Sequence, residues 1–132
     1  MLLTIKKVKS GWRFYYQKYP DDKIISSLYV VNFKNGYAVI CRVYTNNAYR
    51  NKGLAKKLLK FAVDMFGKNY NLKLSASPNR YNENDNIEAL RKKLYLLYSD
   101  FGFELKPNTK TIMIRRKDKT EALETFIKES GV

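Results

Sequence analysis

One segment of the sequence combines residue types that suit the binding of a phosphorylated ligand. It runs from Arg50 to Ala55 (Arg-Asn-Lys-Gly-Leu-Ala), between an apolar run that predicts a buried strand and an amphipathic run that predicts a helix. The first four N–H groups of a helix lack partners within it, and the helix dipole places partial positive charge there. Gly53 would admit a phosphate close to the backbone, and Arg50 and Lys52 add full charges. The segment therefore predicts a pyrophosphate cradle, the alternative being an ordinary basic helix start.

Other kinds of catalytic centre are excluded by residues that the chain lacks. It has no histidine and one cysteine, Cys41. Ser-His-Asp and Cys-His nucleophiles, His-ligated metals and an internal disulfide are therefore excluded, and we predict no metal site. Cys41 stands within an apolar run, which favours a buried structural thiol over an acyl-enzyme nucleophile.

Carboxylates are absent around the predicted cradle. Residues 23–63 contain eight Lys and Arg side chains and no Asp or Glu. No acid there would repel an anion, and none could act as a general base. Glu83 and Asp85 are the nearest candidates by position, but loop carboxylates are usually only solvated, so we assign no base. An amine that arrives partly neutral can react once it is oriented.

The elements that must position these residues follow from the hydrophobic periodicity. Asn35-Gly36 between two β-rich runs predicts a hairpin with a type I′ turn. Strands are predicted at 3–9, 12–17, 28–33, 37–44, 72–77, 101–105 and 111–115. Helices are predicted after Tyr49 as far as Gly67, at 87–101, and after Thr120. We expect one domain over residues 1–132, an α/β (α+β) fold with a mixed sheet.

The two longer predicted helices each carry an apolar face. The first is predicted to bury Leu54, Leu58, Phe61, Ala62 and Met65. The second is predicted to bury Ile87, Leu90, Leu94, Leu97 and Phe101. Asp85 followed by Glu88 is typical of a capping box at its start, where Asn86 also lies. Tyr98 stands one residue off the apolar stripe, so we place it at the edge of the buried face.

Two motifs give the chain a resemblance to a known family. Residues 50–55 fit the (Arg/Gln)-x-x-Gly-x-(Gly/Ala) motif of the GCN5-related N-acetyltransferases, the GNAT family. Residues 97–103 (Leu-Tyr-Ser-Asp-Phe-Gly-Phe) are similar to that family's (Leu)-Tyr-x-x-x-Gly-Phe signature. Both motifs stand in the family's order, and the resemblance spans about residues 28–115. It implies the acyl-CoA N-acyltransferase fold, a mostly antiparallel sheet flanked by helices, in a small member of bacterial or phage type.

The resemblance also implies a reaction and roles for individual residues. Acetyl-CoA would donate its acetyl group directly to a primary amine within a ternary complex. The backbone from Val43 to Thr45 would bind the pantetheine arm and polarise the thioester. The phosphates would be bound by Arg50, Asn51, Lys52, Gly53, Leu54 and Ala55. Tyr98 would protonate the departing thiolate, which suits a hydroxyl that is protonated at neutral pH.

The chain departs from the family pattern near its N-terminal strands. The pair of helices usual between the first two strands is absent or replaced by residues 10–27. That region normally shapes the acceptor site, so the resemblance does not carry over an acceptor.

The charge points to an anionic partner. The net charge is +14, and residues 1–63 hold 13 basic and two acidic side chains. An acidic or nucleic-acid-linked amine acceptor fits this surface. Aromatic and basic residues mix around Trp12, Arg13 and Tyr15, as in single-strand binders, although strand aromatics also serve core packing. Further cations would extend a basic track if they share a face: Lys6, Lys7, Lys9, Lys18 and residues 115–117.

Two alternatives therefore stay open. One is a nucleic-acid-binding protein on a GNAT fold that has lost catalysis, and the other is a GNAT-like DNA-base-modifying enzyme with a different acyl donor. No apolar run is long enough for a signal peptide or a membrane span, so we expect a cytoplasmic protein with no membrane partner. Either a monomer or a homodimer fits the sequence.

Overall fold

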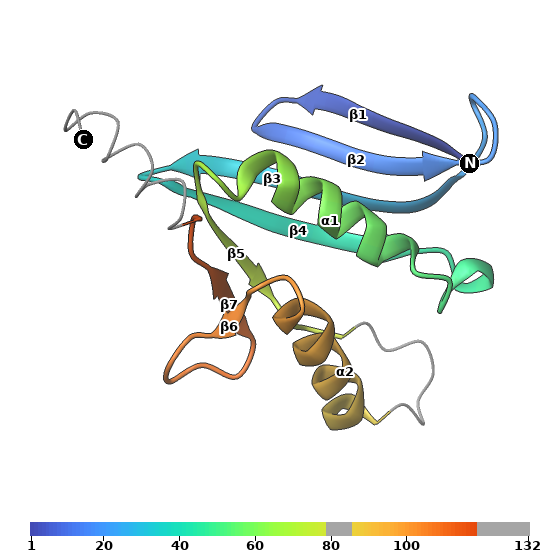
Figure 1. Ribbon diagram of the computed structural model, residues 1–132. Coiled ribbons are helices and arrows are strands. Elements are labelled where there is room, and N and C mark those ends of the chain that lie inside the picture. Colours follow the sequence, from blue (N-terminus) through green and yellow to red (C-terminus); the bar gives the residue numbers. More distant parts are fainter. Residues whose placement is uncertain (79–85, 119–132) are drawn as a thin grey trace, which may run out of the picture.

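The computed structural model describes residues 1–78 and 86–118 (Figure 1). Its strands are β1 (Leu2–Val8), β2 (Gly11–Gln17), β3 (Ile24–Lys34), β4 (Tyr37–Thr45), β5 (Asn71–Ser75), β6 (Glu104–Leu105) and β7 (Ile112–Arg115). Its helices are α1 (Leu54–Phe66), α2 (Ile87–Ser99) and a 3₁₀ turn, η1 (Asn47–Tyr49). The loop carboxylates Glu83 and Asp85 and the helix predicted after Thr120 lie outside the described residues.

The strands form one seven-stranded sheet in the order β1-β2-β3-β4-β5-β7-β6. Every neighbouring pair is antiparallel except β4 and β5, which are parallel and joined through α1. This confirms the mixed, mostly antiparallel sheet. The β3–β4 hairpin turns where it was predicted, because Asn35 (φ 54°) and Gly36 (φ 78°) both adopt the positive φ of a type I′ turn.

Helix α1 packs on one face of the sheet, with Phe66 edge-on to Phe14 at 6.3 Å between ring centroids. The predicted apolar stripe was partly wrong, because Phe61 and Met65 are 42% and 43% exposed. The residues that α1 buries are Leu54, Leu58, Leu59, Ala62, Val63 and Phe66. The two faces share Leu54, Leu58 and Ala62, so the centre of the buried face lies about 70° around the helix axis from the predicted one. The helix stops at Gly67 as predicted.

Helix α2 corrects two further predictions. Its N-cap is Asn86, whose side chain accepts a hydrogen bond from the Ala89 N–H at 3.2 Å, so the capping box at Asp85 was wrong. Of the side chains of α2, Tyr98 alone is fully buried, at 4% exposed, while the predicted apolar stripe is half-buried. Tyr98 therefore lies deeper than the edge position predicted for it, in the same core cluster as α1.

Both helices lie on the same side of the sheet (Figure 1). Arg115 of β7 pairs with Leu72 of β5, so its side chain shares the core face, and it bonds the carbonyls at the ends of both helices. Strands β1 and β2 are joined by Lys9 and Ser10 alone, so the pair of helices that the resemblance implies at this point is absent. No helix among residues 1–78 and 86–118 is long and apolar enough to cross a membrane.

Candidate active site

Strands β4 and β5 separate soon after they meet. Their parallel pairing covers only Tyr37–Val39 against Asn71–Lys73. From Ile40 to Thr45, no strand within the described residues pairs with the β5-facing edge of β4. Figure 1 shows the two strands diverging, with α1 over β4 and α2 beyond β5. Backbone N–H and C=O groups along this edge can therefore pair with an extended ligand, in the manner of an added strand.

A β-bulge explains why β4 bends away. The register with β3 shifts between Ser27–Tyr44 and Tyr29–Cys41, so that Arg42 and Val43 together oppose Leu28. Arg42 adopts a positive φ of 51°. An extra residue of this kind bends its strand and strengthens its twist. The bulge thereby directs Val43 and Thr45, two of the predicted ligand-binding residues, into the divergent part of the strand.

A buried hydroxyl pair holds the end of β4. Ser26 is fully buried, and its Oγ lies 2.9 Å from the Tyr44 carbonyl oxygen and 2.9 Å from Thr45 Oγ1. Ser26 has one proton, which it donates to the carbonyl, so it accepts the proton of Thr45. The following Asn46 N–H donates to the Ile25 carbonyl at 2.7 Å. These bonds fix the last residues of β4 to β3 although β5 has moved away.

The loop after β4 leads directly to the start of α1. Asn46 caps η1 by accepting the Ala48 N–H at 3.0 Å, and Gly53 then forms the N-cap of α1 with φ 76°. A β-carbon added to Gly53 would meet no atom within 4 Å. Glycine is therefore favoured here by the positive φ of the backbone and not by a lack of space. Within residues 1–78 and 86–118 no side chain caps α1, and the first turn of the helix contains no acid. Its first N–H groups therefore lack partners within the helix, close to the open space beside Gly53 and in the positive field of the helix dipole.

The predicted phosphate-binding residues occupy this loop with different exposures. Asn51 (φ 62°), Lys52 and Gly53 are exposed, whereas Arg50 and Ala55 are half-buried. Lys52 Nζ lies 5.5 Å from the Tyr49 ring centroid. Leu54 is 7% exposed because its side chain packs into the core. Leu54 can therefore offer a ligand its backbone N–H and not its side chain.

Tyr98 is surrounded by core side chains near the end of α2. Its ring lies 6.1 Å from that of Phe103, measured between centroids, and the Tyr98 carbonyl accepts the N–H groups of Phe101 and Phe103. Burial raises the pKa of the Tyr98 hydroxyl above its usual value. The hydroxyl is therefore protonated at neutral pH and able to donate a hydrogen bond.

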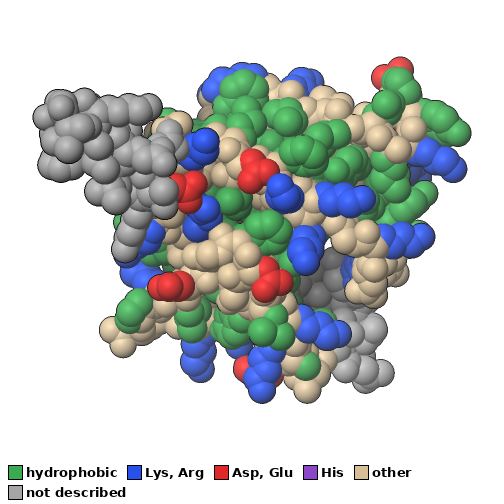
Figure 2. All heavy atoms as spheres, viewed as in Figure 1, with side chains coloured by type: hydrophobic (Ala, Val, Ile, Leu, Met, Phe, Trp, Pro, Cys, Tyr) green, Lys and Arg blue, Asp and Glu red, His purple; other side chains and the backbone are tan. Residues whose placement is uncertain are grey.

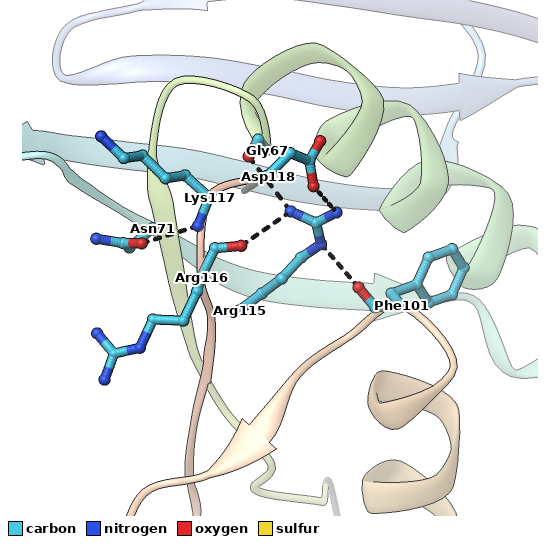
Figure 3. Close-up of polar contacts among 7 residues, drawn as sticks. All are labelled: Gly67, Asn71, Phe101, Arg115, Arg116, Lys117 and Asp118. Atoms are coloured by element: carbon cyan, nitrogen blue, oxygen red, sulfur yellow. Dashed lines mark hydrogen bonds and ion pairs between the residues drawn. The ribbon is translucent and has the colours of Figure 1, made fainter. Parts of the chain in front are cut away.

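Arg115 connects the ends of the two helices (Figure 3). Its Nε donates to the Phe101 carbonyl at 2.8 Å, just beyond α2, and its Nη1 donates to the Gly67 carbonyl at 3.3 Å, just beyond α1. Its Nη2 forms an ion pair with Asp118 at 2.8 Å. Only 16% of the Arg115 side chain is exposed. This arginine holds the C-terminal part of α2, where Tyr98 lies, in a set position relative to α1.

Two other features stand apart from this arrangement. A hollow of about 410 Å³ is lined by residues of the β6–β7 region and by none of the predicted site residues. Cys41 is free and half-buried, and burial raises the pKa of its thiol, which makes it a poor nucleophile. Among the residues that the structure describes, no group of His, Cys, Asp and Glu could hold a metal ion.

A protein-family model matches most of this chain. The model of the acetyltransferase (GNAT) domain matches residues 11–105, well over half of the chain. The chain belongs to the GNAT acetyltransferase family. As a GNAT domain it is an N-acetyltransferase, and its fold is that of the acyl-CoA N-acyltransferases. No curated protein matches this GNAT domain significantly in sequence.

Solved structures share the fold of the GNAT domain at low sequence identity. An acyl-CoA N-acyltransferase from Pseudomonas aeruginosa superposes with a TM-score of 0.59 at 19% identity, over 82% of this chain and 70% of that one. Escherichia coli ElaA gives 0.58 at 16%, over 80% and 68%. The YhbS N-acetyltransferase of Escherichia coli, solved in complex with CoA, gives 0.57 at 16%, over 83% of this chain and 61% of that one.

Three residues of the site region were missed by sequence reasoning. Ser26, with Ser27, interrupts the apolar run of β3, and two small polar residues at this point could have indicated a buried hydrogen bond. Arg42 is a charged residue within the apolar run of β4, which could have indicated a bulge. The sequence around Arg115 gives no signal of its role, because its hydrogen-bond partners Phe101 and Gly67 lie 14 and 48 residues away.

Proposed function

We propose that this chain is an acetyl-CoA-dependent N-acetyltransferase that transfers the acetyl group directly to a primary amine in a ternary complex. One observation supports this above the others. The unpaired edge of β4 leads, through the loop of residues 46–53, to the acid-free start of α1, which no described side chain caps. An extended arm that ends in a pyrophosphate requires this sequence of features, first backbone partners and then an anion site.

The proposed binding of acetyl-CoA uses backbone more than side chains. The pantetheine amides pair with the edge of β4 around Val43 and Thr45, which Ser26 holds in place. The N–H groups of the first turn of α1 donate to the pyrophosphate, and the open space beside Gly53 admits it. Arg50 and Lys52 add positive charge, and Asn51 adds a polar side chain.

The proposed transfer breaks the thioester C–S bond and forms an amide C–N bond. The neutral amine attacks the carbonyl carbon, and the Tyr98 hydroxyl gives its proton to the departing sulfur. The proton that the amine loses passes to solvent, from which Tyr98 regains its own. We assign no side chain as general base, because residues 23–63 carry no carboxylate. Orientation of an amine that arrives partly neutral provides the remaining acceleration.

The acceptor class follows from the surface. Residues 1–63, which include β1–β4 and the cradle, hold 13 cations and two acids. An amine carried on an acidic or nucleic-acid molecule would be attracted to this surface.

Acetyl-CoA binding and turnover test the proposal separately. At a concentration of 100 times its Kd, acetyl-CoA should stabilise the protein by about 2.7 kcal/mol, measured by thermal unfolding. The affinities for desulfo-CoA and for free pantetheine, measured in the same way, show how much the phosphates and the pantetheine arm each contribute to binding. A panel of amines should then reveal an acceptor through release of free thiol. Absence of saturable binding would overturn the proposal, and binding without thiol release on any amine would favour the catalytically inactive alternative.

A further inference from the structure

The sheet has a second face that no described helix covers. Residues paired across neighbouring strands point to the same side, so Phe14, Leu28 and Ile40 lie on the face under α1. The alternate residues of β1–β4 point to the other side, here called the open face. Its members include Leu2, Thr4, Lys6, Val8, Arg13, Tyr15, Gln17, Ser27, Tyr29, Val31, Val39, Cys41 and Tyr44.

Two rows of side chains cross the open face at right angles to the strands. One row runs from Lys6 through Arg13 and Tyr29 to Cys41, and Arg42 of the bulge reaches this row, with its guanidinium 5.7 Å from the Tyr29 ring centroid. Strands lie about 4.8 Å apart, so the row is about 14 Å long. The neighbouring row places Tyr15 and Tyr44 on either side of Ser27. A cationic row thus lies beside an aromatic row.

The two arginines are held close together by one aromatic ring. The Arg13 guanidinium carbon lies 4.9 Å from the Tyr15 ring centroid and 5.3 Å from that of Tyr29, the same ring that Arg42 contacts. Neither arginine has an ion pair with a carboxylate of the described residues, and Arg13 Nε has no hydrogen-bond partner there. Two like charges on one ring raise the local positive potential, which an anion would relieve.

Acids are kept away from this part of the sheet. Strands β1–β4 contain no Asp or Glu. Asp21 and Asp22 lie in the turn between β2 and β3, and Glu104 lies in β6, beyond β5 and β7 in the sheet. The helix side differs, since Figure 2 shows acidic side chains among the Lys and Arg side chains there. The open face therefore presents Lys6, Arg13 and Arg42 with no Asp or Glu within β1–β4 to oppose an anion.

We infer that the open face binds single-stranded nucleic acid, with the phosphates along Lys6, Arg13 and Arg42 and the bases against Tyr15 and Tyr44. Tyr44 is 42% exposed, so its ring is available for stacking. Single-strand sites combine a cationic track with aromatic platforms, and four-stranded sheets of RNA-binding domains stack two or three bases on one face. An acidic peptide would use the cations but would leave the aromatic row without a purpose. This inference does not require that acetyl transfer take place.

A charge-matched pair of variants tests the location. Fluorescence anisotropy of a labelled 12-nucleotide single strand, as DNA and as RNA, gives Kd at several salt concentrations. Lys6→Gln with Arg42→Gln should raise Kd about tenfold or more and lower the slope of log Kd against log salt by about 0.7 per lost phosphate contact. Lys92→Gln with Lys93→Gln removes the same charge from α2 and should change Kd less than about twofold. Equal losses in both variants would overturn the inference.

A second pair tests stacking without a change of charge. Tyr44→Ala should raise Kd about fivefold or more with the salt slope unchanged, while Tyr44→Phe keeps the ring and the affinity. A loss in Tyr44→Phe as large as in Tyr44→Ala would contradict stacking.

The partner class is tested with the unmodified protein. Tighter binding to a duplex of equal length, to a polyglutamate peptide or to phosphatidylglycerol vesicles than to the single strand would also overturn the inference. Lys6→Gln alone, on β1 and separated from β4 by β2 and β3, should bind acetyl-CoA as the parent does, so failure of this inference and failure of the proposed enzymatic function give different results.

Discussion

The Arg115 guanidinium donates through Nε to the Phe101 carbonyl at 2.8 Å, three residues beyond Tyr98 (Figure 3). The same group reaches Gly67 at the end of α1, and a β-carbon placed on Gly67 would lie 2.6 Å from Arg115 Nη1. The contact is therefore tight as well as hydrogen-bonded. It joins two helices that are distant in sequence and contributes to the position of the proposed proton donor.

Arg115→Lys should therefore affect stability and turnover together. Lysine cannot reproduce the fork of donors, so carbonyls at both helix ends lose partners and the unfolding free energy should fall by about 2 kcal/mol. A displaced Tyr98 should lower kcat more than it weakens acetyl-CoA binding. Arg116→Lys is the matched control, because Arg116 is exposed and bonds the Tyr37 hydroxyl at 3.0 Å. Equal effects of the two substitutions in thermal unfolding and steady-state kinetics would contradict this positioning role.

Substitutions at Gly53 should change the stability of α1 and the binding of phosphate in opposite directions. Asn and Asp both tolerate the left-handed conformation that Gly53 adopts (φ 76°), and they differ mainly in charge. Gly53→Asp should stabilise α1 by up to about 1 kcal/mol relative to Gly53→Asn, because a carboxylate complements the helix dipole. It should nevertheless weaken acetyl-CoA binding by about tenfold or more, because it repels the pyrophosphate. Calorimetric titration checks this, and similar acetyl-CoA affinities for the two variants would place the phosphates elsewhere.

Tyr98→Phe should remove the proton donor and leave the cofactor site intact. We expect kcat to fall about 100-fold or more, with the Kd for acetyl-CoA within about twofold of the parent. Because burial raises the pKa of Tyr98, the parent's kcat should show no loss from Tyr98 ionisation up to about pH 9. Tyr95→Phe is the control. Tyr95 lies one helical turn before Tyr98 and its hydroxyl donates to the Lys110 carbonyl, so this variant should retain the parent's turnover. Retention of turnover by Tyr98→Phe would remove Tyr98 from the mechanism.

The raised pKa of Tyr98 also predicts how stability depends on alkaline pH. The unfolded chain ionises this tyrosine at about pH 10, whereas the folded state keeps it protonated to higher pH. Its contribution to the unfolding free energy is therefore complete below about pH 10 and is lost as pH rises through the folded pKa. Denaturant unfolding between pH 8 and 11 should show a smaller decline for Tyr98→Phe than for the parent. Parallel curves would mean that the hydroxyl is solvated.

The rotated face of α1 gives a prediction about stability alone. Leu58→Ala should lower the unfolding free energy by about 2–5 kcal/mol, because this side chain is fully buried. Phe61→Gln, at an exposed position three residues later, should change it by no more than about 0.5 kcal/mol. Chemical denaturation of both variants checks the difference, and a large cost at Phe61 would restore the face predicted from the sequence.

Local chemistry determined much of this fold before any tertiary contact was considered. Asn35-Gly36 specifies its turn through the φ values that those residues tolerate, and Gly67 ends α1. The order of the motifs at 50–55 and 97–103 indicated the family that the matching domain model confirms. Each of these signals lies within a few neighbouring residues, so the sequence carries it directly.

Tertiary structure decided the rest, because the deciding partners are far apart along the chain. Phe61 was predicted to be buried from its helical spacing, yet the sheet meets α1 about 70° further around the helix axis. The bulge at Arg42 exists only relative to β3, and the Arg115 bonds form only when α1, α2 and β7 meet. The open face likewise arises from pairing across four strands, which brings Lys6, Arg13 and Tyr29 into one row. Hydrophobic periodicity shows that a helix or strand has an apolar face, but tertiary packing determines which of its side chains the rest of the protein covers.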